Sequence, residues 1–180
     1  MYANLSGGPF ATYQEFASYM FLNRSYVEDS VFTYAIMDSR TLAGMISLTR
    51  VDPINRYAHL SVVQVLPTSQ GKGIATRAAQ MLLWHTMSRD GLGLVRTTWR
   101  ATTENQASIN LARKLGFKEV GTTKYEKLLT DAAARGKVGN GRLAPPGTPD
   151  GAVWRDVISF DLCWDDEIPS DASFTTSDVN

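Results

Sequence analysis

The chain has 180 residues, of which 43% are hydrophobic, and its 18 lysines and arginines balance 18 aspartates and glutamates. This composition predicts one domain with a sizeable core, and the balanced charge argues against a protein that binds nucleic acid or a membrane surface. The single cysteine, Cys163, excludes an internal disulfide, and with only two histidines besides it no structural metal is expected.

The N-terminal region shows no targeting signal and one helix signal. The first residues lack the charged start and apolar core of a signal peptide, and no apolar run could span a bilayer, so we expect a cytoplasmic protein. Residues 1–11 form a poor strand, because Gly7, Gly8 and Pro9 interrupt it. The capping-box pattern of Thr12 and Glu15 then predicts a first helix over about residues 12–24, packed against a sheet.

Three strands and a long helix follow. Apolar runs separated by turn residues predict strands over 32–37, 42–50 and about 57–66, which form an antiparallel meander. A helix is predicted from Ile74 to just before the Arg89–Gly93 stop. Its apolar stripe comprises Ile74, Ala78, Met81 or Leu82, and His85, so we expect His85 to be a core residue.

The remaining chain adds three strands and one helix. A strand over 94–100 is predicted to lie parallel to the central strand, and a helix over 105–115 ends at Gly116, where a left-handed cap is expected. Strands over 118–129 and 153–164 would form a final antiparallel pair. We therefore predict one domain over residues 1–164, with a long loop at 130–152 and an acidic, flexible tail at 165–180.

A glycine-containing loop connects the central strand to the long helix. Gly71 and Gly73 flank Lys72, and glycines at a helix start let a phosphate approach backbone N–H groups that lack helical partners. An ordinary strand-to-helix turn is the alternative. A Walker loop does not fit, because Leu66 stands where its first glycine is needed and Gly73 follows the lysine. Thr76 stands where a dinucleotide fingerprint needs its third glycine.

Two motifs together carry a family resemblance. Gln70, Gly73 and Ala75 form Gln-x-x-Gly-x-Ala, which resembles the pyrophosphate loop of the GNAT superfamily of acyl-CoA-dependent N-acyltransferases. Further along, Asn-x-x-Ser from Asn105, followed by Lys-Leu-Gly-Phe, resembles the second GNAT signature as found in the ribosomal-protein N-acetyltransferase branch. The resemblance extends from about residue 34 to 122.

The resemblance implies an α/β fold and a cosubstrate. The fold is a mixed, mostly antiparallel twisted sheet flanked by helices, with a splayed central pair of parallel strands. GNAT chains normally open with a strand, which here is missing or supplied in another way. The cosubstrate is acetyl-CoA, with its arm bonded to the central strand and its pyrophosphate at the loop. The residues implied to bind it are Val63, Gln64, Val65, Gln70, Gly71, Lys72, Gly73, Ile74, Ala75, Asn105 and Ser108.

The candidate catalytic residues are His59 and Ser108. Many GNAT enzymes place a tyrosine acid at the position of Ala112, so Ser108 is the replacement candidate for protonating the thiolate. It could instead be a helix-face serine bonded to its own backbone. A family glutamate base maps onto His59 or Leu60, depending on where the strand bulges. Histidine can take a proton, although it could also merely cap the sheet edge. Cys163 could form an acyl-cysteine but fits an inert core residue better.

We therefore predict an N-acetyltransferase that transfers an acetyl group from acetyl-CoA to a primary amine by direct attack in a ternary complex. The acceptor is a protein N-terminus or a small amine, and a homodimer is left open. A non-catalytic acyl-CoA-binding module is the alternative. The 130–152 loop is expected to be mobile and to cover the acceptor, favouring anionic or polar acceptors through Arg135, Lys137 and Arg142. The alternative is a disordered insertion.

Overall fold

The computed structural model describes residues 12, 14–15, 31–133 and 135–167. Three predictions fall largely outside these residues. They are the helix over 12–24, the missing or replaced first strand before it, and the tail beyond 167. At the start of that helix the Glu15 amide donates to the Thr12 hydroxyl oxygen at 3.1 Å, which is the contact that the capping box predicts.

Strands and helices follow the predicted order, with bounds that differ by one or two residues. Gly116 adopts the predicted left-handed conformation, with φ 89°, at the end of the second helix of this region. No helix among the described residues is long and apolar enough to cross a membrane. The elements are β1 (Phe32–Asp38), β2 (Thr41–Asp52), β3 (Tyr57–Val65), the 3₁₀ turn η2 (Pro67–Ser69), α2 (Ile74–Met87), β4 (Arg96–Thr102), α3 (Gln106–Lys114), β5 (Lys118–Leu129) and β6 (Val153–Cys163).

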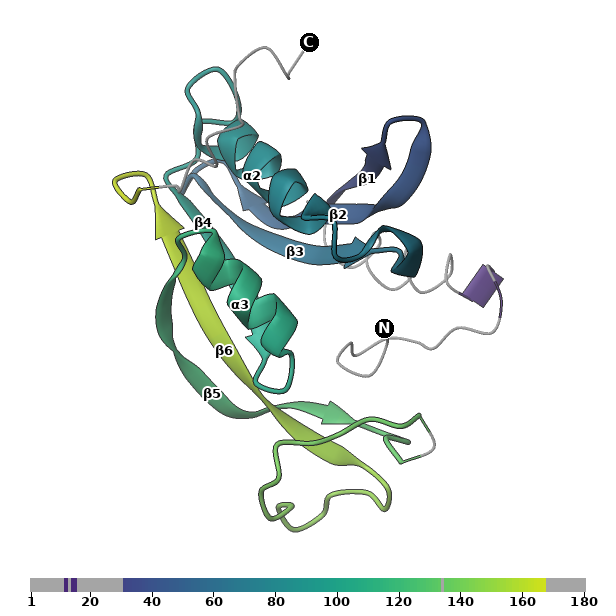
Figure 1. Ribbon diagram of the computed structural model, residues 1–180. Helices are drawn as coiled ribbons and strands as arrows, with labels where there is room; N and C mark the ends of the chain where they lie inside the picture. The colour runs from purple at the N-terminus through teal and green to yellow at the C-terminus, as the bar shows by residue number, and fades with distance from the viewer. Residues whose placement is uncertain (1–11, 13, 16–30, 134, 168–180) are drawn as a thin grey trace.

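The described strands form one mixed sheet in the order β1-β2-β3-β4-β6-β5. Only β3 and β4 run parallel, and the other neighbouring pairs are antiparallel, so the predicted mixed sheet is confirmed. Helices α2 and α3 lie on the same face, α2 over the β2–β3 half and α3 over β4 (Figure 1). These two helices therefore cover one face of the sheet and do not contact the opposite face.

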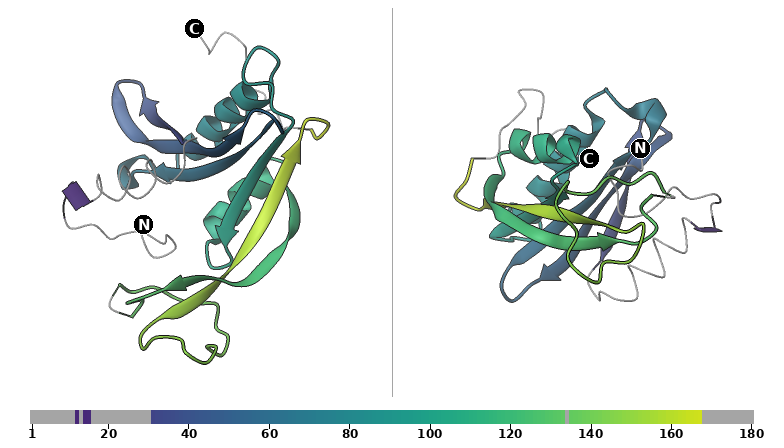
Figure 2. Two further views of the ribbon diagram at one scale, coloured as in Figure 1. Left: turned by 180° about the vertical axis from the view of Figure 1, so that it is seen from behind. Right: turned by 90° about the horizontal axis from the view of Figure 1, so that it is seen from below.

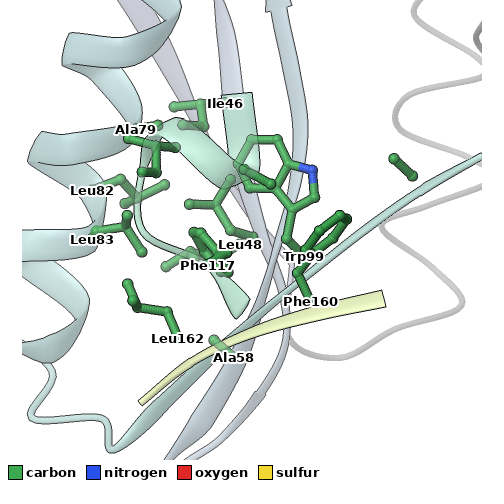
Figure 3. Close-up of a cluster of buried hydrophobic side chains, with 14 of the residues drawn as sticks. Ile46, Leu48, Ala58, Ala79, Leu82, Leu83, Trp99, Phe117, Phe160 and Leu162 are labelled. Carbon is green, nitrogen blue, oxygen red and sulfur yellow. The ribbon is translucent and has the colours of Figure 1, made fainter. Parts of the chain in front are cut away.

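The core lies between the two helices and the sheet. Figure 3 shows Leu82 and Leu83 of α2 facing the large side chains of the strands, among them Leu48, Trp99 and Phe160. Alternation along each strand separates this core from the opposite face. On β4 the buried set is Thr97, Trp99 and Ala101, whereas Arg96, Thr98 and Arg100 point the other way.

The predicted core position of His85 is wrong, because this side chain is exposed. The buried stripe of α2 runs through Ala79, Leu82, Leu83 and Thr86, which are spaced i, i+3, i+4 and i+7. His85 falls between these positions and turns to the surface, where Met81 and Trp84 are also exposed.

The 130–152 loop is fastened to the start of β6. Asn140 donates its backbone N–H to the Trp154 carbonyl at 2.7 Å, and the Trp154 indole N–H donates to the Thr148 hydroxyl at 2.9 Å. The Arg142 guanidinium pairs with the Asp156 carboxylate at 2.9 Å, and Lys137 is buried. We expected three cations of this loop to bind an acceptor. Two of them, Arg142 and Lys137, instead take part in the packing of the loop.

Candidate functional site

The parallel strands β3 and β4 separate towards their carboxyl ends. Their paired residues run from Tyr57 and Arg96 to Leu60 and Trp99. Beyond these positions β3 continues alongside β2 and β4 continues alongside β6, and Figure 2 shows the two halves of the sheet moving apart. Among the described residues, then, the facing edges of β3 and β4 pair over only part of their length. An extended ligand carrying amide groups can bond to such an edge.

A β-bulge at Val62 marks the point of separation. The register with β2 shifts there, because Ile46 pairs with Val63 and Ser47 pairs with Ser61. Val62 has φ 38°, which is unusual for a β-branched residue. Bulges and backbone strain of this kind concentrate next to active sites, where they re-aim backbone groups.

The start of α2 offers an anion site at the end of β3. Its N-cap is Gly73, with φ 72°, and the preceding Gly71 has φ 77°, so both glycines are required by the backbone. No side chain caps the helix and its first turn holds no acidic residue. Its first N–H groups and the positive end of the helix dipole therefore favour a phosphate. Lys72 is exposed beside them.

Arg77 adds a cation here that the sequence motifs did not single out. Its Nη1 lies 3.4 Å from the position that a Cβ on Gly73 would take. The spacing of four residues from the N-cap could have indicated it, since such a residue stands one turn above the helix start.

Gln70 has a different contact from the one that its motif position suggests. Its Nε2 donates to the Val65 carbonyl at 2.9 Å, so the side chain ties the loop back to the end of β3. Binding of a pyrophosphate by Gln70 stays a prediction, while the bond to Val65 shows how the loop keeps its position.

Asn105 and Ser108 meet at the start of α3. Asn105 is the N-cap, and its Oδ1 accepts a hydrogen bond from the Ser108 N–H at 3.2 Å. The Ser108 hydroxyl oxygen accepts the indole N–H of Trp99 at 2.9 Å. The contact of this hydroxyl is thus with β4 rather than with its own helix backbone. Ala112, at the position of the family tyrosine, is fully buried.

His59 lies on the sheet face opposite α2 and α3. Its Nδ1 is 2.9 Å from the hydroxyl oxygen of Thr98, its register partner on β4. Leu60 points into the core and is 2% exposed, and the bulge comes only at Val62. Of the two alternatives for a base, His59 is therefore the one whose side chain lies on the face opposite α2 and α3, one residue before the strands separate.

Cys163 does not belong to this arrangement. It pairs with Arg96, at the opposite end of β4 from the strand separation. Burial raises the pKa of its thiol, and the carboxylates of Asp166, Asp161 and Asp165 raise it further. A thiol of this kind is a weak nucleophile at neutral pH, which disfavours an acyl-cysteine route.

Comparison with known proteins identifies the family. The model of the GNAT acetyltransferase domain matches residues 5–118. The chain belongs to the GNAT acetyltransferase family. Acetyl-CoA is the acyl donor of this family, as the two motifs implied. The finer resemblance to the ribosomal-protein branch stays a prediction.

Individual GNAT proteins are similar over part or most of the chain. A spermidine N(1)-acetyltransferase of Escherichia coli is 32% identical over 84 residues, which is 47% of this chain and 44% of that protein. The match thus spans less than half of this relative. A probable GNAT acetyltransferase from Chromobacterium violaceum superposes with a TM-score of 0.69 at 21% identity, covering 91% of this chain and 74% of that one. A spermidine N-acetyltransferase from Vibrio cholerae in complex with CoA and spermine gives 0.64 at 20% identity, covering 91% and 82%. These likenesses show the GNAT fold.

Proposed function

We propose that this GNAT protein transfers an acetyl group from acetyl-CoA to a primary amine by direct attack in a ternary complex. One relationship carries the proposal: the pairing of β3 with β4 ends beside an uncapped helix N-terminus. A phosphate site thereby adjoins a strand edge that can hold an amide-containing arm. The match to spermidine acetyltransferases supports a small-molecule amine as the acceptor.

The residues around the strand separation fit acetyl-CoA. The α2 N-terminus with Gly71, Lys72 and Gly73 would hold the pyrophosphate, and a side chain at Gly71 would meet nothing within 4 Å, so the loop is open on that side. The backbone of Val63–Val65 would bond the arm, and Asn105 and Ser108 would approach it from α3. Acetyl-CoA would supply the activated thioester carbonyl.

Two side chains would handle protons. An alkyl amine has a pKa of about 10.4 and must lose a proton before it attacks. His59 would accept that proton on the face of β3 opposite α2 and α3, while Thr98 holds its Nδ1. Because the Ser108 oxygen already accepts the Trp99 indole N–H, its own proton stays available for the departing thiolate. A backbone N–H at the Val62 bulge would stabilise the oxyanion.

Release of free CoA thiol, followed with DTNB over a panel of primary amines, tests this function. Acetyl-CoA turnover that depends on an amine is the expected result. Binding of acetyl-CoA without turnover of any amine would instead support a non-catalytic acyl-CoA module, which the buried Ala112 at the place of the family tyrosine favours.

A charge substitution in the loop tests the cosubstrate site. Gly73→Glu places a negative charge at the α2 N-terminus, and calorimetry should show acetyl-CoA binding lost. Gly73→Asn is the matched control, because asparagine tolerates a left-handed backbone without adding charge. Equal affinities of the two variants would remove this loop from the site.

A further inference from the structure

We propose that Trp99 restricts the acyl donor to acetyl-CoA, because its indole ring fills the space at the strand separation that a longer acyl chain would need. This inference rests on the proposed function, and it names the donor class of the same site. The residues assigned to acetyl-CoA so far contact the pyrophosphate, the arm and the sulfur, which every acyl-CoA shares. They therefore do not select the acyl group.

Trp99 stands where the pairing of the parallel strands ends. The last pair joins Leu60 of β3 to Trp99 of β4, and the two side chains are buried on the side of α2 and α3, at 2% and 3% exposure. One pair earlier, His59 Nδ1 lies 2.9 Å from the hydroxyl oxygen of Thr98, so a side-chain contact joins the strands on the opposite face as well. An acyl group held at the Val62 bulge would thus meet the indole ring on its core side.

The indole ring also reaches the position proposed for the thioester. Its N–H donates to the Ser108 hydroxyl oxygen at 2.9 Å, and the proposed function places that hydroxyl at the departing thiolate. The acyl carbonyl carbon is bonded directly to this sulfur, so the first methylene groups of a longer chain would lie within a few bonds of it. They would therefore compete with the indole for the same space.

Contacts on several sides hold the ring of Trp99 in place. Besides the hydrogen bond to Ser108, its ring makes an edge contact with Phe117, with centroids 5.6 Å apart and 64° between the planes. Phe160, its register partner on β6, is fully buried and lies beside it in Figure 3. Cores are close-packed, and a displaced ring would leave a buried N–H without its acceptor. The ring therefore resists an incoming acyl chain.

The other directions around the thioester already have occupants in the proposed function. Towards the carboxyl end of β3, the arm of the cosubstrate would bond to the backbone of residues 63–65. On the face of His59, the acceptor amine would approach the carbonyl carbon. A longer acyl chain is left with the core side, where Trp99 lies.

A series of acyl donors tests the proposal directly. Acetyl-, propionyl-, butyryl- and hexanoyl-CoA are compared with one amine, by kcat/KM from DTNB and by dissociation constants from calorimetry. One methylene group in a hydrophobic pocket changes kcat/KM by about 10- to 200-fold. We expect the wild type to prefer acetyl-CoA over butyryl-CoA by about a hundredfold, the effect of two methylene groups. Trp99→Leu, which removes the ring but stays apolar, should reduce that preference about tenfold or more, in binding as well as in turnover.

Two further variants separate a specific role from a structural one. Trp99→Phe keeps an aromatic ring and should shift the donor preference in the same direction as Trp99→Leu, by a smaller factor. Phe160→Leu is the matched control, because it removes a buried ring at the same register on β6, the neighbour of β4 on the side away from β3. It should leave the preference unchanged. Each value is a ratio between donors within one protein, so a loss of stability or of overall rate cancels.

A wild type that uses butyryl-CoA as well as acetyl-CoA would overturn the proposal, and so would equal preferences in Trp99→Leu and Phe160→Leu. Amine-dependent turnover of any donor would still uphold the transferase function. If no donor is turned over with any amine, the transferase function fails, and the ratios of the dissociation constants still decide whether Trp99 selects the acyl group. The two failures can therefore be told apart.

Discussion

The indole N–H of Trp99 donates a hydrogen bond to the hydroxyl oxygen of Ser108 at 2.9 Å. Trp99 is 3% exposed in the core, where its ring also meets the edge of Phe117, with centroids 5.6 Å apart. The bond joins the buried side of β4 to the first turn of α3. A candidate catalytic hydroxyl is thus also the partner of a buried donor.

Ser108→Ala should therefore lower both stability and activity. The substitution leaves the Trp99 N–H buried without its acceptor, which costs about 1–3 kcal/mol in the free energy of unfolding. Denaturant titration measures this loss. In Trp99→Phe the donor is absent, so adding Ser108→Ala to that variant should cost less than it does alone. Additive losses would show that the bond contributes little.

His59→Ala should lower kcat by about a hundredfold, the low end of general-base contributions. The acid limb of the pH–rate profile should disappear with the imidazole. Thr98→Val removes the contact to Nδ1 and should shift that limb, whereas Thr98→Ser, which keeps a hydroxyl, should restore it. If His59→Ala retains the rate and the profile, the amine reaches the enzyme already deprotonated.

Asp156 should make stability depend on acid pH. Burial alone would raise the pKa of its carboxyl, but hydrogen bonds from Asn140, the Tyr125 N–H and Arg142 together lower it. A lowered folded pKa gives stability that is present above the unfolded value of about 3.9 and is lost as the pH falls through the folded value.

The variant Asp156→Asn checks this dependence. It should be less stable than the wild type at pH 7, because an amide cannot accept all three hydrogen bonds. Urea midpoints of the two proteins should begin to approach each other as the pH falls below the unfolded value of about 3.9, and should converge only once the pH has fallen through the lowered folded pKa of Asp156. A difference that stays constant over this range would assign the effect to packing alone.

Cys163→Ser should leave kcat unchanged. The thiol has a raised pKa. Cys163 ends β6 and lies beside Arg96, at the start of β4, which is distant from the strand separation. Initial-rate patterns should therefore show a ternary complex rather than a ping-pong mechanism, and iodoacetamide should react slowly at neutral pH. Rapid inactivation by alkylation that acetyl-CoA prevents would contradict this.

The sequence alone determined the features that depend on neighbours in the chain. Gly71 and Gly73 have the left-handed conformations that the turn into α2 requires, and Asn105 caps α3 with its own side chain. Apolar runs placed the strands to within about two residues, because strand formation follows local alternation and turn chemistry. The family followed from the same short motifs.

Tertiary structure decided what depends on register. Whether His59 or Leu60 faces away from the core follows from the bulge at Val62, which arises from pairing with β2. The Ser108 contact requires Trp99 on another element, and the role of Arg142 requires Asp156. His85 shows the same limit within a helix, since the sheet selected the buried stripe of α2. Local sequence fixes where the backbone can bend, whereas long-range pairing and packing decide which side chains meet.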